Sequence, residues 1–141
     1  MARTPTIIVH DRVQADAALS AAGSAGVAIV LMSPPGAGAT LGPGVFKAMT
    51  DEAMAAYPET TAAAVLDCAA EAGIALAAIR HGCPHIAIDL PKDVAAKIED
   101  MAAQSRTVVH VPSAGAVLDL GAGPEPEHRA QVFLNRELAH V

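Results

Sequence analysis

The chain has 141 residues, of which 52% are hydrophobic and only 2% are aromatic, and its formal net charge at pH 7 is −6. A chain of this length can bury a core without disulfides or metals, and this core must be built mainly from alanine, valine, isoleucine and leucine. The negative charge and the scarcity of aromatic rings exclude nucleic acid as an expected partner, because phosphate contacts need basic residues and base stacking needs aromatic ones.

Membrane association and secretion are not expected either. No apolar segment approaches the roughly 20 residues of a membrane-spanning helix, and the first residues lead into a strand pattern without a signal-peptide core. An anionic lipid surface would repel a chain of this charge, and two cysteines are too few for a disulfide framework. These features predict a soluble cytoplasmic protein with no membrane partner.

The N-terminal part of the chain predicts a strand, a helix and a second strand. Residues 6–10 form a short β-rich run, and the alanine-rich residues 11–24 follow as a helix. Asp11 and Gln14 stand at the spacing of a capping box, which marks the start of this helix. Residues 27–32 are a continuous apolar run, typical of a strand that is buried on both faces.

The glycine-rich segment at residues 33–44 is the clearest candidate for a binding site. Its four glycines and three prolines exclude the interior of a helix or a central strand, so it is predicted to be a loop that precedes a helix. Glycines let backbone N–H groups approach a ligand, and a helix N-terminus favours an anion. Lys47, one turn inside that helix, is a further candidate for contact with an anion. The competing interpretation is a plain connecting loop or a subunit contact.

The rest of the chain alternates helical and strand patterns. Helical patterns occupy residues 45–57, 71–80 and 91–101, and strand patterns occupy residues 62–66, 86–90 and 107–111, with a candidate short strand at 116–120. Strands that alternate with helices indicate βαβ units and a parallel sheet, and right-handed crossovers then favour a doubly wound topology. We therefore predict a three-layer, flavodoxin-like α/β fold with a mainly parallel five-stranded sheet; a half-barrel fragment is the alternative.

A glycine- and proline-rich stretch separates this body from a last helical pattern. Apolar residues recur there at helical spacing, at Ala130, Leu134, Leu138 and Val141. Such an amphipathic helix can fold back on its own domain, which we favour, or reach a neighbouring subunit and support a homo-oligomer. The predicted organisation is a single α/β domain at residues 1–120, a hinge at 121–126 and a C-terminal helix at 127–141.

Polar side chains follow the predicted strands at their carboxyl ends, where ligands bind in open parallel sheets. Each also has a structural interpretation, as a helix cap or as a hydrogen-bonded polar residue at a strand end. The candidate acid–base residues are His10, Asp67 and His110. The candidate ligand-binding residues are Ser33, Gly36, Gly38, Gly42, Gly44, Asp11 and Asp89.

One further segment carries residue types that bind metals. His81, Cys83 and His85 offer imidazole and thiolate groups, which are zinc ligands. The segment leads into the amino end of a strand, away from the predicted ligand edge, and Pro84 stiffens it, so we expect no metal. Cys68 is predicted to be a small buried hydrophobe rather than a reactive thiol, and a disulfide between the two cysteines is not expected because they are predicted at opposite ends of the sheet.

The central part of the chain, residues 27–101, resembles a two-component receiver domain in its layout. Residues 29–36, Ile-Val-Leu-Met-Ser-Pro-Pro-Gly, look like the strand and proline loop that carry the phosphoacceptor in that family. Residues 78–91 look like the family's closing helix, strand and proline. The resemblance implies a receiver-like fold.

The positions that carry the chemistry of that family differ here. Val30 or Leu31 stands where the phosphorylated aspartate is expected, and Leu90 stands where a lysine is expected, so no active residue is carried over. We therefore expect a small α/β protein that binds a small anionic ligand beside residues 36–44, at the carboxyl edge of the sheet. The spacing of its candidate residues selects no reaction and no cofactor. The alternative is a non-catalytic, pseudo-receiver-like interaction module that forms oligomers.

Overall fold

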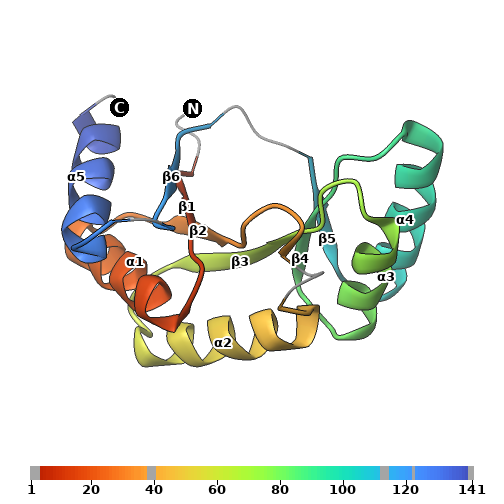
Figure 1. Cartoon of the computed structure of the whole chain (residues 1–141), viewed down its shortest axis with the longest axis horizontal. Helices are drawn as coiled ribbons and strands as arrows, with labels where there is room; N and C mark the ends of the chain where they lie inside the picture. The colour runs from red at the N-terminus through yellow and green to blue at the C-terminus, as the bar shows by residue number, and fades with distance from the viewer. Residues whose placement is uncertain (1–3, 38–40, 112–114, 122, 140–141) are drawn as a thin grey trace. The chain divides into compact units, whose positions relative to one another are not determined.

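A computed structural model describes residues 4–37, 41–111, 115–121 and 123–139 of the chain. These residues form a parallel α/β fold with six strands and with helices on both faces of the sheet (Figure 1). The elements in chain order are β1 (Thr6–Ile8), α1 (Arg12–Ala25), β2 (Ile29–Met32), α2 (Pro43–Ala56), β3 (Ala62–Asp67), α3 (Ala72–Arg80), β4 (His85–Ala87), α4 (Lys92–Gln104), β5 (Val108–His110), β6 (Val117–Asp119) and α5 (Pro126–Ala139).

The predicted three-layer α/β fold is confirmed, with one correction to the number of strands. The sheet has the strand order β5-β4-β3-β2-β1-β6 and therefore six strands rather than five. The sixth is the short candidate strand, which pairs in parallel with β1 so that Thr6 lies opposite Val117 and Ile8 lies opposite Asp119. A three-residue strand has too few residues for its alternation to distinguish it from a loop, so only its pairing identifies it.

The chain divides into two compact units. Unit 1 comprises Met1–Met32, Met49–Ala63 and Ala114–Val141, and unit 2 comprises Ser33–Ala48 and Ala64–Ser113. The predicted division into a domain at residues 1–120, a hinge at 121–126 and a terminal helix stays a prediction, and Ala122 lies outside the described residues.

Unit 1 is built around β1, which pairs in parallel with β2 on one side and β6 on the other. Its core combines large aliphatic residues of the strands with small residues of α1. The alanines of α1 let a neighbouring helix approach closely, and α5 packs against it (Figure 1). The largest fully buried core side chains are Ile7, Leu19, Ile29, Leu31, Leu120 and Leu134.

The C-terminal helix folds back within unit 1, as the favoured interpretation of its pattern predicted. Ala130 and Leu134 are fully buried in the core of the unit. Leu138 remains 45% exposed, and Val141 lies outside the described residues. The buried stripe of α5 is therefore occupied by contacts within the chain.

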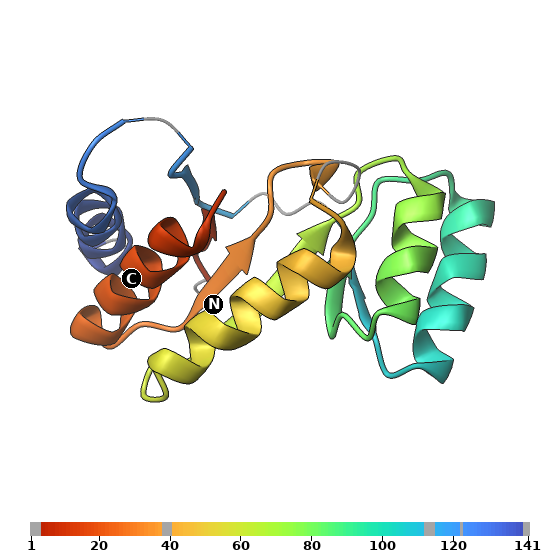
Figure 2. The same cartoon turned by 60° about the horizontal axis from the view of Figure 1, so that its bottom comes forward.

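Unit 2 contains most of β3 and the parallel strands β4 and β5, together with α3 and α4, which pack side by side (Figure 2). Val65 lies opposite His85, and Ala87 lies opposite His110. Leu66 and Ile86 are fully buried at the centre of this unit. None of the helices in the described residues combines the length and the apolar composition of a membrane-spanning segment.

Candidate functional site

The carboxyl ends of β1 and β6 bring a histidine and an aspartate together in unit 1. His10 Nε2 lies 2.7 Å from Asp119 Oδ1, and the two side chains are 37% and 55% exposed. The backbone of His10 is fixed because its N–H donates to Gln14 Oε1 at 2.8 Å. The predicted capping box contributes to this, since the Asp11 carboxylate accepts the N–H of Gln14 at 2.8 Å and closes the first turn of α1.

The loop after β6 completes this pair. The N–H of Gly121 donates to Asp119 Oδ1 at 2.7 Å, and a Cβ on Gly121 would lie 2.5 Å from His10 Nε2. Arg129 holds the loop by donating to the carbonyls of Leu120, Gly123 and Pro124. Partial burial opposes ionisation of Asp119, but the hydrogen bonds from His10 and Gly121 and the charge of Arg129 outweigh it and lower the pKa of Asp119.

Ser33 and Asp67 meet in unit 2, where both are used to hold the backbone. Buried Ser33 Oγ accepts the N–H of Asp67 at 2.9 Å and donates to the carbonyl of Pro34 at 3.2 Å. The Asp67 carboxylate accepts the N–H of Ala69 at 2.9 Å. This bond supports the positive φ of 50° at Ala69, so the contacts of Asp67 are those of a turn-forming residue.

Most of the other residues predicted to bind a ligand cap a helix or make backbone hydrogen bonds within the chain. Asp11 is the N-cap of α1, and Asp89 is exposed with its N–H donated to the carbonyl of Ala69. Gly36 adopts a φ of 71° and donates its N–H to the carbonyl of Asp67, so this amide is already paired. Gly42 has a φ of 83°, and its carbonyl accepts the N–H of Phe46 at the start of α2. Gly38 lies outside the described residues.

The first turn of α2 lies against the segment that joins α3 to β4. A Cβ on Gly44 would be 3.1 Å from His81 Nδ1, so the imidazole ring lies beside this turn. Cys83 Sγ lies 3.7 Å from the carbonyl oxygen of Pro43. The sequence predicted residues 81–85 away from the candidate ligand edge, and it did not predict the proximity of His81 to Gly44, which depends on tertiary packing rather than on local pattern.

Backbone donors, a lysine and a histidine lie in the neighbourhood of this turn. Among the described residues, no acceptor faces the N–H of Gly44 or of Val45, as is usual for the first amides of a helix. Lys47 is on the same helical face as Gly44, and its Cε lies beside Gly82. We call Gly44, Val45, Lys47 and His81 the α2 anion cluster.

Two histidines meet on neighbouring strands of unit 2. His85 Nδ1 lies 3.1 Å from His110 Nε2, and the ring centroids are 5.2 Å apart. Burial, and to a smaller extent the adjacent His85 ring, lowers the pKa of His110. No group of three or more metal-ligating side chains occurs in the described residues. His110, a predicted acid–base residue, is therefore in contact with His85, which the sequence offered as a metal ligand.

The two cysteines are buried thiols. Burial, together with the nearby Asp67 carboxylate, raises the pKa of Cys68 to about 12. A thiol of this kind stays protonated and unreactive at neutral pH.

Sequence reasoning missed Asp119, Gly121 and the contact between His81 and Gly44. A signal for the first two existed, because an aspartate stands near the end of the candidate strand at 116–120 and a glycine follows the strand directly. No known protein family model matches the chain, and no curated protein matches it.

Proposed function

We propose that the protein binds a small anionic ligand, a phosphate or carboxylate group, at the α2 anion cluster. The observation that supports this most strongly is the position of the His81 ring against Gly44, where the first amides of α2 face no acceptor among the described residues. A helix N-terminus carries a partial positive charge, and its amides can donate to an oxyanion. The glycine at position 44 leaves this backbone uncovered by a side chain of its own.

The two basic side chains give the cluster its selectivity for anions. Lys47 supplies a permanent positive charge, and His81, which is exposed, supplies a ring N–H or a positive charge. A hydrogen bond to a charged group contributes roughly 1.5–3 kcal/mol. Because the whole chain carries a charge of −6, anion binding must come from local groups rather than from the overall field. We place this activity in the cytoplasm, where both thiols remain reduced.

Titration calorimetry with inorganic phosphate and with malonate tests this function. We expect saturable binding at low ionic strength, weakened at least about tenfold by Lys47→Ala or by His81→Ala. Lys97→Ala removes an exposed lysine of α4 and is the matched control, with unchanged affinity expected. Binding that is equal in all three variants, or absent for both anions in the wild-type protein, would refute the proposal.

A second candidate function is an oligomeric interaction module. It is supported by two large apolar side chains of α5, Val132 and Leu138, which are 43% and 45% exposed. We propose that these side chains contact a second copy of the chain. Light scattering after size-exclusion chromatography should then show an oligomer that dissociates on Val132→Asp with Leu138→Asp, and a wild-type monomer would contradict this.

A further inference from the structure

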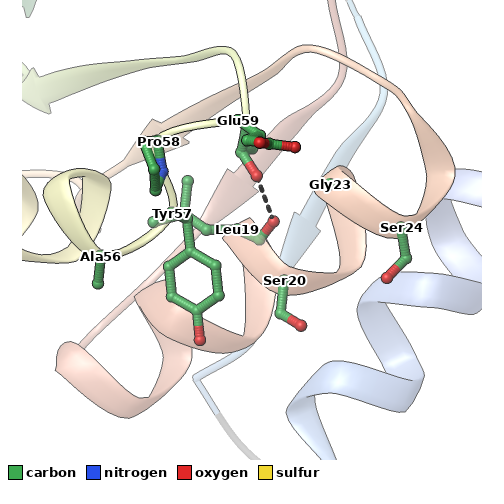
Figure 3. A pocket seen from close by; sticks show the side chains of 9 residues that line it. Leu19, Ser20, Gly23, Ser24, Ala56, Tyr57, Pro58 and Glu59 are labelled. Carbon is green, nitrogen blue, oxygen red and sulfur yellow. Dashed lines mark hydrogen bonds between the residues drawn. The ribbon is translucent and has the colours of Figure 1, made fainter.

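A pocket of about 360 Å³ opens in unit 1 between the second half of α1 and the turn that follows α2 (Figure 3). It lies apart from the His10–Asp119 pair, and none of its lining residues belongs to the α2 anion cluster. Small-molecule sites usually have volumes of about 300–1,000 Å³, so its size fits a small ligand. Its polar lining side chains are Ser20, Ser24, Tyr57, Glu59 and Thr60.

Hydrogen bonds fix the walls of this pocket. Thr60 Oγ1 donates to the carbonyl of Leu19 at 3.0 Å and joins the turn to α1 (Figure 3). The turn is closed by the N–H of Thr60, which donates to the carbonyl of Tyr57 at 3.0 Å. Gly23 permits this approach, because a Cβ there would lie only 2.7 Å from Thr60 Oγ1. The pocket is therefore present before a ligand arrives.

Four of the polar side chains remain available to a ligand. In the part of the chain that the structure describes, Ser20, Ser24, Tyr57 and Glu59 make no side-chain hydrogen bond or ion pair. By contrast, the hydroxyl of Thr60 is engaged in holding the turn. Polar side chains that line a pocket and make no hydrogen bond of their own can orient a ligand there.

The charged and polar groups that line the pocket favour a positively charged ligand. Of the residues that the structure describes, Glu59 is the one charged residue that lines this pocket, and no lysine or arginine lines it. The face of the Tyr57 ring attracts cations, and the hydroxyl oxygens of Ser20 and Ser24 can accept hydrogen bonds from an ammonium group. The net charge of −6 adds a long-range attraction in the same direction.

From these groups we propose that the pocket binds a small aliphatic amine. The ammonium group pairs with the Glu59 carboxylate and lies over the Tyr57 ring, while the serine hydroxyls accept its remaining N–H donors. The alkyl part contacts the exposed apolar side chains of Ala56 and Pro58, which also line the pocket. This site is separate from the proposed anion site, so either one can fail without the other.

Calorimetric titration of the full chain with 1,4-diaminobutane at low ionic strength tests the site, with 1,4-butanediol and succinate as neutral and anionic analogues of similar length. We expect saturable binding of the diamine alone, weakened at least about tenfold by Glu59→Gln. Tyr57→Leu should weaken binding about fivefold, whereas Tyr57→Phe should retain most of it because the ring face is kept. Glu99→Gln, on the exposed surface of α4, should leave the affinity unchanged.

Two results would overturn the proposal. One is diamine binding that survives Glu59→Gln or falls equally with Glu99→Gln, which indicates attraction to the overall negative charge rather than to this pocket. The other is an absence of diamine binding to the wild-type chain, or equal binding of the diol. Glu59 is exposed, so its isosteric replacement leaves the fold intact.

Discussion

Gly121 occupies a position where the side chains of His10 and Asp119 leave no space for a Cβ. A Cβ there would lie 2.5 Å from His10 Nε2 and 2.9 Å from Asp119 Oδ1. The Gly121→Ala substitution must therefore separate the pair, and we expect it to lower the free energy of unfolding by about 1 kcal/mol. Urea denaturation measures this change, and the NMR signals of the His10 ring report the separation.

Gly73→Ala is the matched control for this prediction. Gly73 is in the first turn of α3, where a Cβ would meet nothing within 4 Å and the φ is not positive. Alanine should leave stability unchanged or raise it by up to about 1 kcal/mol, because it favours the helix. Equal destabilisation by both substitutions would show that the His10–Asp119 pair is not the cause.

The lowered pKa of Asp119 should also make the free energy of unfolding depend on pH. Its pKa is lowered from 3.8 in the folded chain, so its contribution to stability is present above the unfolded value and is lost as the pH falls through the folded value. The side chain is exposed, and the contribution should stay below about 1 kcal/mol. The difference in unfolding free energy between the wild-type chain and Asp119→Asn should therefore shrink from pH 6 to pH 3. A difference that is constant over this range would contradict the assignment.

The contact of α5 with α1 contributes buried side chains to the core of unit 1. Leu134 is fully buried in the core, whereas Leu138, one turn further along α5, is 45% exposed. Leu134→Ala should lower the free energy of unfolding by about 2–5 kcal/mol, because it leaves a cavity. Leu138→Ala should cost less than about 1 kcal/mol. Similar costs in urea denaturation would show that α5 is not docked as described.

The contact between β4 and β5 makes unit 2 sensitive to pH. Burial and His85 lower the pKa of His110, so the unfolded chain binds more protons than the folded one between the lowered value and 6.5. Stability should therefore fall as the pH decreases through this window. His110→Gln should reduce the loss between pH 7.5 and pH 5, while His128→Gln, on the exposed face of α5, should not. An unchanged loss in His110→Gln would refute this cause.

The sequence patterns identified the helices and strands, but not how their ends meet. Strand patterns that alternate with helical patterns were sufficient to predict the parallel α/β fold, because the period of the apolar residues in each segment can be read from that segment alone. The pairing of His85 with His110 depends on register and on strand length. Ala87 lies opposite His110, and in strands of three residues the start of β4 is close to the end of β5. No local pattern contains that information.

The candidate site was likewise predictable only in part. The glycine-rich segment and Lys47 were recognisable from composition and from the helix that follows. The involvement of His81 was not, because it depends on the packing of α2 against the α3–β4 connection. Ser33 and Asp67 were singled out correctly as polar residues at strand ends, but their side chains hydrogen-bond backbone atoms of the surrounding loops.

The two proposed sites lie in different units and bind ligands of opposite charge. The α2 anion cluster is in unit 2, and the amine pocket is in unit 1. Added salt should weaken both, since each depends on charge. Because no residue is shared, Lys47→Ala should leave diamine binding intact and Glu59→Gln should leave phosphate binding intact. Loss of both activities in either variant would indicate a global change in the fold rather than two separate sites.

A ¹H–¹⁵N NMR titration with inorganic phosphate tests the proposed function most directly, because it reports on each backbone amide. The proposal predicts saturable shifts that are largest for the amides of Gly44 and Val45 and that disappear in His81→Ala with Lys47→Ala. The amide of Gly36, which already donates to Asp67, should move little. Shifts that are absent at Gly44 and Val45, or no larger there than on the exposed surface of α4, would contradict the account.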